Sequence, residues 1–218
     1  MFFMVKVECF PLGELQANCY FVTEGNDMSL LIDPGEPSSE VEKRVREFGE
    51  KKLRYILLTH GHFDHIGGVV HFKKLFPDAQ IVISEKDSAF TKENRLNLSL
   101  YFMEHFENFD SDIKVNEGDE LDFGSDPIRI MSTPGHTAGG VCYLMGDCIF
   151  TGDTVMSGTT GRMDFPTGSS RDMFQSVARI ASIREDLKMY CGHGEATTLG
   201  YEREHNIYMR KDRYDDLY

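Results

Sequence analysis

The sequence has no long hydrophobic run, few cysteines and a shortage of positive charge. No window reaches the roughly 18 consecutive apolar residues of a membrane helix, so no transmembrane span is predicted. The first ten residues lack the basic segment, apolar segment and cleavage site of a signal peptide, which favours a cytoplasmic protein. The cysteines form no CxxC pair and no zinc-finger spacing, and we expect buried free thiols at Cys9, Cys19, Cys142, Cys148 and Cys191.

Acidic residues clearly outnumber basic ones. There are 36 Asp and Glu against 23 Lys and Arg, and the formal net charge is −13. Such a surface repels a phosphate backbone, so the composition disfavours a general nucleic-acid-binding protein. The one basic run, residues 209–213, is interrupted by Asp212 and followed by more aspartates. We expect it to be a solvated helix face.

The chain shows no linker, internal repeat or low-complexity tract, and we expect one domain over residues 1–218. Apolar segments bounded by turn residues predict strands at 4–10, 18–24, 29–35, 54–59, 80–84, 113–115, 119–123, 127–132, 141–146, 148–152 and 187–192. Helical spacing and capping residues predict helices at 37–49, 67–77, 85–110, 170–183 and 200–210. Two strand-rich halves interleaved with helices indicate two sheets packed together with helices outside.

The stretch "LLTHGHFDHIGG", residues 57–68, places four potential metal ligands directly after a predicted strand. Side chains two residues apart in extended chain point the same way, so His60 and His62 can bind one ion. Asp64 and His65 follow a bend and can reach a second ion. Imidazole and carboxylate suit zinc, and iron or manganese nearly as well. No cysteine stands in a ligand position, which argues against a closed structural zinc site.

Three further candidates stand in glycine-containing loops after predicted strands: His136 in "PGHT", Asp153 in "GDT" and His193 in "GHG". Glycine allows the backbone to bend tightly and to approach a buried ion. Each short motif alone is a weak signal, but four such places together indicate a metal centre. The remaining histidines lie in helical patterns without glycine, and we expect surface or packing roles for His71, His105 and His205.

The pattern H-x-H-x-D-H, then His, Asp and His, resembles the metallo-β-lactamase superfamily over nearly the whole chain. The resemblance implies an α/β (α+β) fold, a four-layer αββα sandwich of two mixed β-sheets flanked by helices, with the metal site at one edge between the sheets. It also implies two divalent ions. One is bound by His60, His62 and His136, the other by Asp64, His65 and His193, and Asp153 bridges them.

Two further residues each have two interpretations. Asp33 in "LLIDPG" matches a family position near the site, where it would orient a ligand histidine. It could equally accept turn hydrogen bonds before the Pro-Gly pair. Arg162 could bind a substrate carboxylate through its guanidinium fork. Alternatively, it pairs with Asp164 and shapes its own loop.

The stretches "GRMDFPTGSSRDMFQSVARI" and "GHGEATTLGYEREHN" resemble the small glyoxalase II-like hydrolases and the related persulfide dioxygenases. The resemblance implies a dinuclear-metal hydrolase of small-molecule thioesters or related esters, with zinc, or else iron or manganese, as the metal. A hydroxide between the ions would attack the carbonyl carbon, with Asp64 and Asp153 as catalytic residues. The alternative is a persulfide dioxygenase with a single iron. Full-length glyoxalase II binds glutathione with a C-terminal helical domain. Only 25 residues follow His193 in this sequence, so the thiol of the substrate stays open. The sequence also leaves the oligomeric state open.

Overall fold

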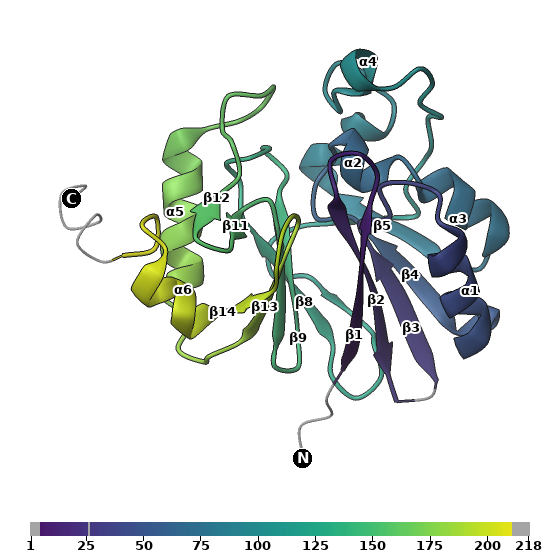
Figure 1. The fold of residues 1–218 in the computed structure, drawn as a ribbon, viewed down its shortest axis with the longest axis horizontal. Helices are drawn as coiled ribbons and strands as arrows, with labels where there is room; N and C mark the ends of the chain where they lie inside the picture. Colours follow the sequence, from purple (N-terminus) through teal and green to yellow (C-terminus); the bar gives the residue numbers. More distant parts are fainter. Residues whose placement is uncertain (1–4, 26, 211–218) are drawn as a thin grey trace.

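The computed structural model describes residues 5–25 and 27–210 (Figure 1). The first sheet has the strand order β1-β2-β3-β4-β5-β6, with β1 at Lys6–Leu12, β2 at Ala17–Glu24, β3 at Met28–Ile32, β4 at Leu53–Leu57, β5 at Gln80–Ser84 and β6 at Ile113–Val115. The second sheet has the order β14-β13-β10-β9-β8-β7, with β7 at Glu120–Leu121, β8 at Ile128–Ser132, β9 at Val141–Met145, β10 at Cys148–Gly152, β13 at Lys188–Cys191 and β14 at Thr197–Thr198. A small hairpin pairs β11 (Val155–Met156) with β12 (Thr159–Thr160).

Helices lie on the outer faces of both sheets (Figure 1). The α-helices are α1 (Ser39–Phe48), α2 (Phe63–Ile66), α3 (Val69–Leu75), α4 (Ser99–Phe102), α5 (Ser170–Ala181) and α6 (Leu199–His205), and the 3-10 helices are η1 (Glu50–Lys52) and η2 (Glu85–Thr91). Side chains of Ser38 and Ser169 cap α1 and α5 by accepting backbone N–H bonds, as expected for residues that precede a first turn.

Three apolar layers separate four layers of secondary structure. Strand β2 shows why, because alternate side chains of a strand point to opposite faces. Cys19 and Phe21 pack toward α1 and α3, whereas Tyr20 and Val22 pack against the second sheet. A third apolar layer lies between the second sheet and α5 and α6, around Met173, Val177 and Ile180. The αββα sandwich implied by the sequence pattern is therefore present.

Parallel strands bring their following loops to one edge of each sheet. Strands β3 and β4 run parallel, as do β10 and β13. The loops that follow β3 and β4 begin near Asp33 and His60, and those that follow β10 and β13 contain Asp153 and His193. The carboxyl ends of these strands meet at a common edge, and the candidate ligands therefore gather there.

Several expectations from the sequence are wrong or only partly met. Residues 85–110 do not form a helix: they contain only η2 and the single-turn α4, joined by irregular chain. The last helix ends at His205 rather than continuing to 210, and the strand expected at 119–123 is limited to Glu120–Leu121. Cys9 is exposed, whereas the other four cysteines are buried free thiols. Most of the basic run at 209–213 lies outside the described residues. None of the helices in the described ranges combines the length and apolar character that crossing a membrane requires.

Candidate metal centre

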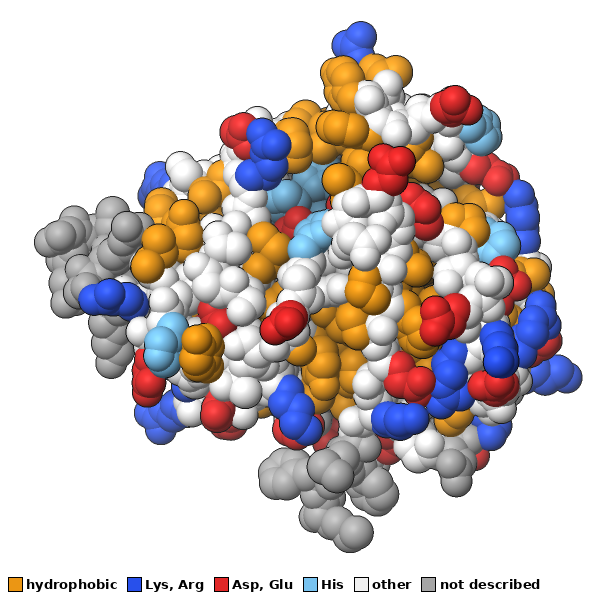
Figure 2. Space-filling model, viewed as in Figure 1, with side chains coloured by type: hydrophobic (Ala, Val, Ile, Leu, Met, Phe, Trp, Pro, Cys, Tyr) orange, Lys and Arg blue, Asp and Glu red, His pale blue; other side chains and the backbone are white. Residues whose placement is uncertain are grey.

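The structure brings together seven side chains that the sequence singled out as ligands. We call this set the cage: His60, His62, Asp64, His65, His136, Asp153 and His193. His60 and His62 lie in the loop after β4, and Asp64 and His65 lie in the first turn of α2. The other three come from loops of the second half of the chain. Figure 2 shows histidine and acidic side chains in a hollow of the surface that is bordered by hydrophobic side chains.

The cage consists of two groups of three ligand atoms around a shared carboxylate. The atoms of His60, His62 and His136 lie within 4.8 Å of one another, and so do those of Asp64, His65 and His193. Asp153 lies between the two groups. Its Oδ2 is 3.4 Å from His136 Nε2 and 3.6 Å from His193 Nε2, and its Oδ1 is 3.6 Å from His65 Nε2. The arrangement indicates a dinuclear site.

Hydrogen bonds outside the cage hold the imidazole rings of four cage histidines. His136 Nδ1 lies 2.7 Å from the carbonyl oxygen of Arg162, and His193 Nδ1 lies 3.1 Å from the carbonyl oxygen of Leu15. In each case the nitrogen must donate, because a carbonyl oxygen only accepts. His65 donates from Nδ1 to Asp33 Oδ2 at 3.0 Å, and His60 Nδ1 lies 3.1 Å from Thr59 Oγ1. These contacts leave Nε2 of each ring facing the cage, as metal ligation requires.

Asp33, directly after β3, holds both His65 and Thr59, the residue next to His60. Its carboxylate accepts from the Thr59 N–H at 2.7 Å and from the Thr59 hydroxyl at 2.6 Å, in addition to His65. Its φ of 51° places this non-glycine residue in the left-handed region, which is uncommon. Of the two interpretations that the sequence left open, the structure supports the orienting role.

The two ligand groups of the cage differ in charge. Burial lowers the pKa of His62 to about 3, and also lowers that of His60, so both imidazoles are neutral. Around His65 burial acts in the same direction, but Asp64, Asp153 and Asp33 outweigh it and raise its pKa to about 10. His65 and His193 in turn hold the pKa of Asp64 well below its usual range, against the effect of burial. The carboxylate-rich group therefore attracts a cation strongly.

The donor set fits two divalent cations. Two buried ligand atoms, His60 Nε2 and Asp153 Oδ1, have no hydrogen-bond partner among the described residues. Leaving such atoms unpaired is costly, so they point to a bound group. His62 faces its ligand group with Nδ1, which lies 2.8 Å from His136 Nε2. The backbone at Gly192 packs directly against the cage: a Cβ added there would lie 2.1 Å from Asp153 Oδ1 and would displace this carboxylate. Nitrogen and carboxylate oxygen ligands without cysteine suit zinc and iron.

Asp87 and Asn18 tie the ligand loops together, and the sequence reading missed both. The buried carboxylate of Asp87 accepts from the backbone N–H groups of Gly61 and Gly139 and from the Thr137 hydroxyl at 2.7–3.1 Å. It thereby joins the loop of His60 and His62 to that of His136. The Asn18 amide donates to the carbonyl oxygens of Cys191 and Gly194 on either side of His193. No short motif marks either residue.

A cavity of about 510 Å³ opens over the cage. Cage residues form its floor, and its apolar lining includes Leu15, Phe63, Leu98, Phe102, Met156 and Phe165. Arg162 also lines this cavity, but Asp164 binds its guanidinium through two hydrogen bonds of 2.7 Å, and the group lies 3.9 Å from the centre of the Phe165 ring. The internal ion pair that the sequence offered as one interpretation is thus present.

The other histidines lie outside the cage. His71 contacts Glu42 on α1 at 2.7 Å, and His205 stacks on Tyr201 with ring centres 4.1 Å apart. His105 is exposed and lines a second cavity described below. Cys191 is fully buried, and burial raises its pKa to about 12, so it has little thiolate character at neutral pH.

The model of the metallo-β-lactamase superfamily matches residues 12–193. Among curated proteins, the hydroxyacylglutathione hydrolase GloC of Haemophilus influenzae is 28% identical, over 94% of this chain and 98% of that protein. The probable polyketide biosynthesis zinc-dependent hydrolase PksB of Bacillus subtilis is 30% identical, over 89% of this chain and 82% of that protein.

Two solved structures have the same arrangement of secondary structure. BLEG-1, a B3 metallo-β-lactamase, aligns with a TM-score of 0.82 and 28% identity over 94% of this chain and 99% of that one. TTHA1623, solved in a di-iron-bound form, aligns with a TM-score of 0.82 and 29% identity over 93% of this chain and 100% of that one. Zinc and iron thus both occur among similar proteins.

Proposed function

The chain belongs to the metallo-β-lactamase superfamily and is a metal-dependent hydrolase of that fold, and we propose that its substrate is a small-molecule thioester. The observation that carries the hydrolase assignment is the pair of three-ligand groups around Asp153, with buried ligand atoms that lack partners. Two divalent ions in the cage would supply Lewis acidity, which lowers the pKa of water and withdraws charge from a carbonyl oxygen.

The residues of the chain position the reactants. His60, His62 and His136 would hold one ion and Asp64, His65 and His193 the other, with Asp153 contacting both. The hydrogen bonds at Nδ1 of His60, His65, His136 and His193 fix the direction of each Nε2 lone pair. Apolar side chains of the cavity above, Leu15 and Phe102 among them, would exclude water from the thioester and leave its carbonyl carbon facing the cage.

The lack of a proton donor at Asp64 favours a thiolate as leaving group. An amide nitrogen must be protonated as it departs, whereas a thiol with a pKa of about 8.5 departs as the thiolate. Asp64 belongs to one of the two ligand groups, and a carboxylate that binds a cation has no proton to donate. Asp64 lines both cavities and would therefore lie beside a bound substrate, but it would not act as a general acid. The likeness to GloC supports the same choice.

The alternative, a persulfide dioxygenase with one iron, requires only one of the two ligand groups. The complete second group of Asp64, His65 and His193 favours hydrolysis, because it has no task in a mononuclear oxygenase.

The test compares the two reactions on one preparation loaded with zinc or iron. We expect thiol release from a butyryl thioester under anaerobic conditions, followed with a disulfide dye. We also expect no oxygen uptake with glutathione persulfide at an oxygen electrode. Rapid oxygen consumption without thioester cleavage would overturn the proposal in favour of the dioxygenase.

A further inference from the structure

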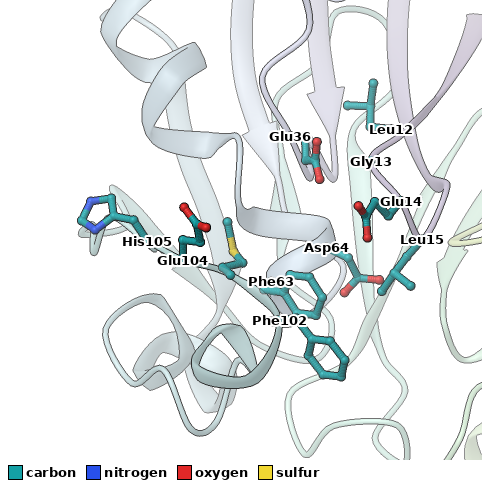
Figure 3. Close-up of a pocket in the computed structure, with 11 residues that line it drawn as sticks. Leu12, Gly13, Glu14, Leu15, Glu36, Phe63, Asp64, Phe102, Glu104 and His105 are labelled. Atoms are coloured by element: carbon teal, nitrogen blue, oxygen red, sulfur yellow. The ribbon is translucent and has the colours of Figure 1, made fainter.

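A second cavity, of about 550 Å³, continues from the first (Figure 3). Leu15, Phe63, Asp64 and Phe102 line both cavities, so the two meet beside the cage. A molecule bound over the cage can therefore occupy both at once. A thioester has two arms that meet at the reacting carbonyl, the acyl group and the thiol part, and two joined cavities match that shape.

The first cavity suits an apolar arm. Its lining beyond the cage is apolar, apart from Gly161 and Arg162. Asp164 binds the Arg162 guanidinium through two hydrogen bonds, so this arginine is already engaged. An uncharged acyl group would bind in this cavity more favourably than a charged one, because burial of its apolar surface is favourable and no charge is desolvated.

The second cavity has the opposite electrostatic character. Three carboxylates, Glu14, Glu36 and Glu104, line it, and no Lys or Arg is among its lining residues. Asp64 also lines it but belongs to the cage, and the remaining titratable side chain in the lining is His105. No ion pair joins any of the three glutamates to a cation within the described residues. Figure 3 shows Glu14, Glu36 and Asp64 on one side of the cavity and Glu104 toward the other. An anionic arm would be repelled from both directions, whereas a cationic arm would meet uncompensated negative charge.

Aromatic rings form the junction between the cavities. Phe63 and Phe102 stack with ring centres 5.2 Å apart and an interplanar angle of 9°. Phe102 is 61% exposed and Leu15 is 52% exposed, so large apolar surfaces face the space that a substrate would fill. A ring face next to carboxylates is a favourable environment for an alkylammonium group, through cation–π attraction and Coulomb attraction together.

We propose that the substrate is a thioester whose thiol part carries a positive charge, with an apolar acyl group in the cavity over the cage and the cationic thiol part in the acidic cavity. This inference rests on the proposed function, since it assigns the two arms of the same substrate. Thiols with a net negative charge, such as glutathione or coenzyme A, are then poor carriers for this enzyme.

The test uses three butyryl thioesters that differ only in the thiol part. Butyrylthiocholine carries a quaternary ammonium group, the 3,3-dimethylbutyl thioester is its neutral isostere, and the 2-sulfoethyl thioester is an anion. With the metal-loaded enzyme at low ionic strength, we expect kcat/KM to fall in that order, by at least tenfold between the cation and the anion. High salt should narrow the range, because these carboxylates are exposed and screened by ions.

A charge-neutralised variant separates the acidic cavity from the rest of the protein. The triple variant E14Q, E36Q and E104Q should lose most of the preference for the cation, measured as the ratio of kcat/KM for the cationic ester to kcat/KM for the neutral ester. The matched control E40Q, D78N and E204Q removes the same charge from positions outside both cavity linings, and it should keep the preference.

The outcomes distinguish the two proposals. Cleavage of the anionic ester as fast as the cationic one, or a preference that survives in the triple variant, would overturn the inference and leave thioester hydrolysis standing. If none of the three esters is cleaved, thioester hydrolysis itself fails, and the inference fails with it.

Discussion

A metal-binding histidine needs a fixed ring as much as a free lone pair, and here the fixing groups come from several parts of the chain. Asp33 serves His65, and the carbonyl oxygens of Arg162 and Leu15 serve His136 and His193. Backbone acceptors cannot be recognised in a sequence, because every residue has one. The ligands could therefore be predicted from their spacing and glycine neighbours, whereas most of the residues that orient them could not.

Among single residues, Asp153 is the one whose replacement should reduce activity most. An Asp153→Asn variant keeps the shape of the side chain but removes the charge that faces both ligand groups. We expect thioester hydrolysis to fall by at least about a hundredfold, with bound metal reduced as well. His71→Ala, which removes only a contact with Glu42 outside the cage, serves as the control and should stay near full activity. Equal activities for the two variants would show that the cage is assigned wrongly.

Asp87 offers a test of positioning without direct contact with an ion. Its carboxylate accepts three hydrogen bonds, and burial raises its pKa. In Asp87→Asn one amide N–H group would face a donor, so we expect a loss of about 1–3 kcal/mol in unfolding free energy. Metal affinity should fall by about tenfold or more, because the loops of His60 and His136 lose their common anchor. Chemical denaturation and metal titration measure the two effects. Asp78→Asn, at an exposed position outside the cage, should change neither.

Among the elements, the segment 85–110 shows where sequence periodicity misleads. Its apolar residues recur at helical spacing, yet Phe90 is buried from the 3-10 helix η2, and Leu98 and Phe106 are buried from irregular chain. The buried Asn97 amide donates to the Phe90 carbonyl oxygen, and its side-chain oxygen accepts from the Ser99 N–H, so local side-chain bonds replace helical ones. Leu98, with a φ of 67°, interrupts the helix outright. By contrast, α1 and α5 have serine caps visible in the sequence, and both formed where expected.

The first edge strand should depend on pH through one ion pair. Arg44 of α1 binds Glu8 of β1 through hydrogen bonds of 2.8–3.0 Å, and this lowers the pKa of Glu8. A carboxyl group whose pKa is lower in the folded state stabilises the protein above its unfolded pKa of about 4.3. That stability disappears as the pH falls through the folded value. Glu8→Gln should therefore cost about 0.5–1 kcal/mol at pH 7, a small figure because solvent screens the pair.

Denaturant unfolding at pH 7 and at pH 3 measures this effect. The difference between the variant and the unchanged protein should shrink at the lower pH. A difference that stays constant across this range would assign the loss to packing of the side chain rather than to its charge.

At the scale of the whole molecule, the cage joins the two halves of the sandwich. Four of its residues follow β4 in the first half, and His136, Asp153 and His193 lie in loops of the second. The pattern of strands and helices could be predicted from apolar spacing, and the edge position of the site follows from the parallel strands. The pairing of the halves could not be predicted from local sequence, because it depends on contacts such as Asn18 with the loop of His193, which join residues far apart in the chain.

Metal removal should therefore destabilise the sandwich as a unit. A ligand that binds only the folded state stabilises it by about 2.7 kcal/mol at a free concentration of one hundred times its Kd. For a protein of this size each kcal/mol corresponds to about 2–4 °C, so chelation should lower the melting temperature by at least about 5 °C. Elemental analysis should find two ions per chain before chelation, and zinc or iron should restore the melting temperature. His136→Ala should lower the metal content and reduce the fall in melting temperature on chelation. His60 and His62, which belong to the same ligand group, come from the first half of the sandwich, so His136 is the only ligand of that group from the second half. His205→Ala, outside the cage, should change neither the metal content nor the fall in melting temperature on chelation. If chelation leaves the melting temperature of the metal-loaded protein unchanged, the bound ions do not join the two halves of the sandwich.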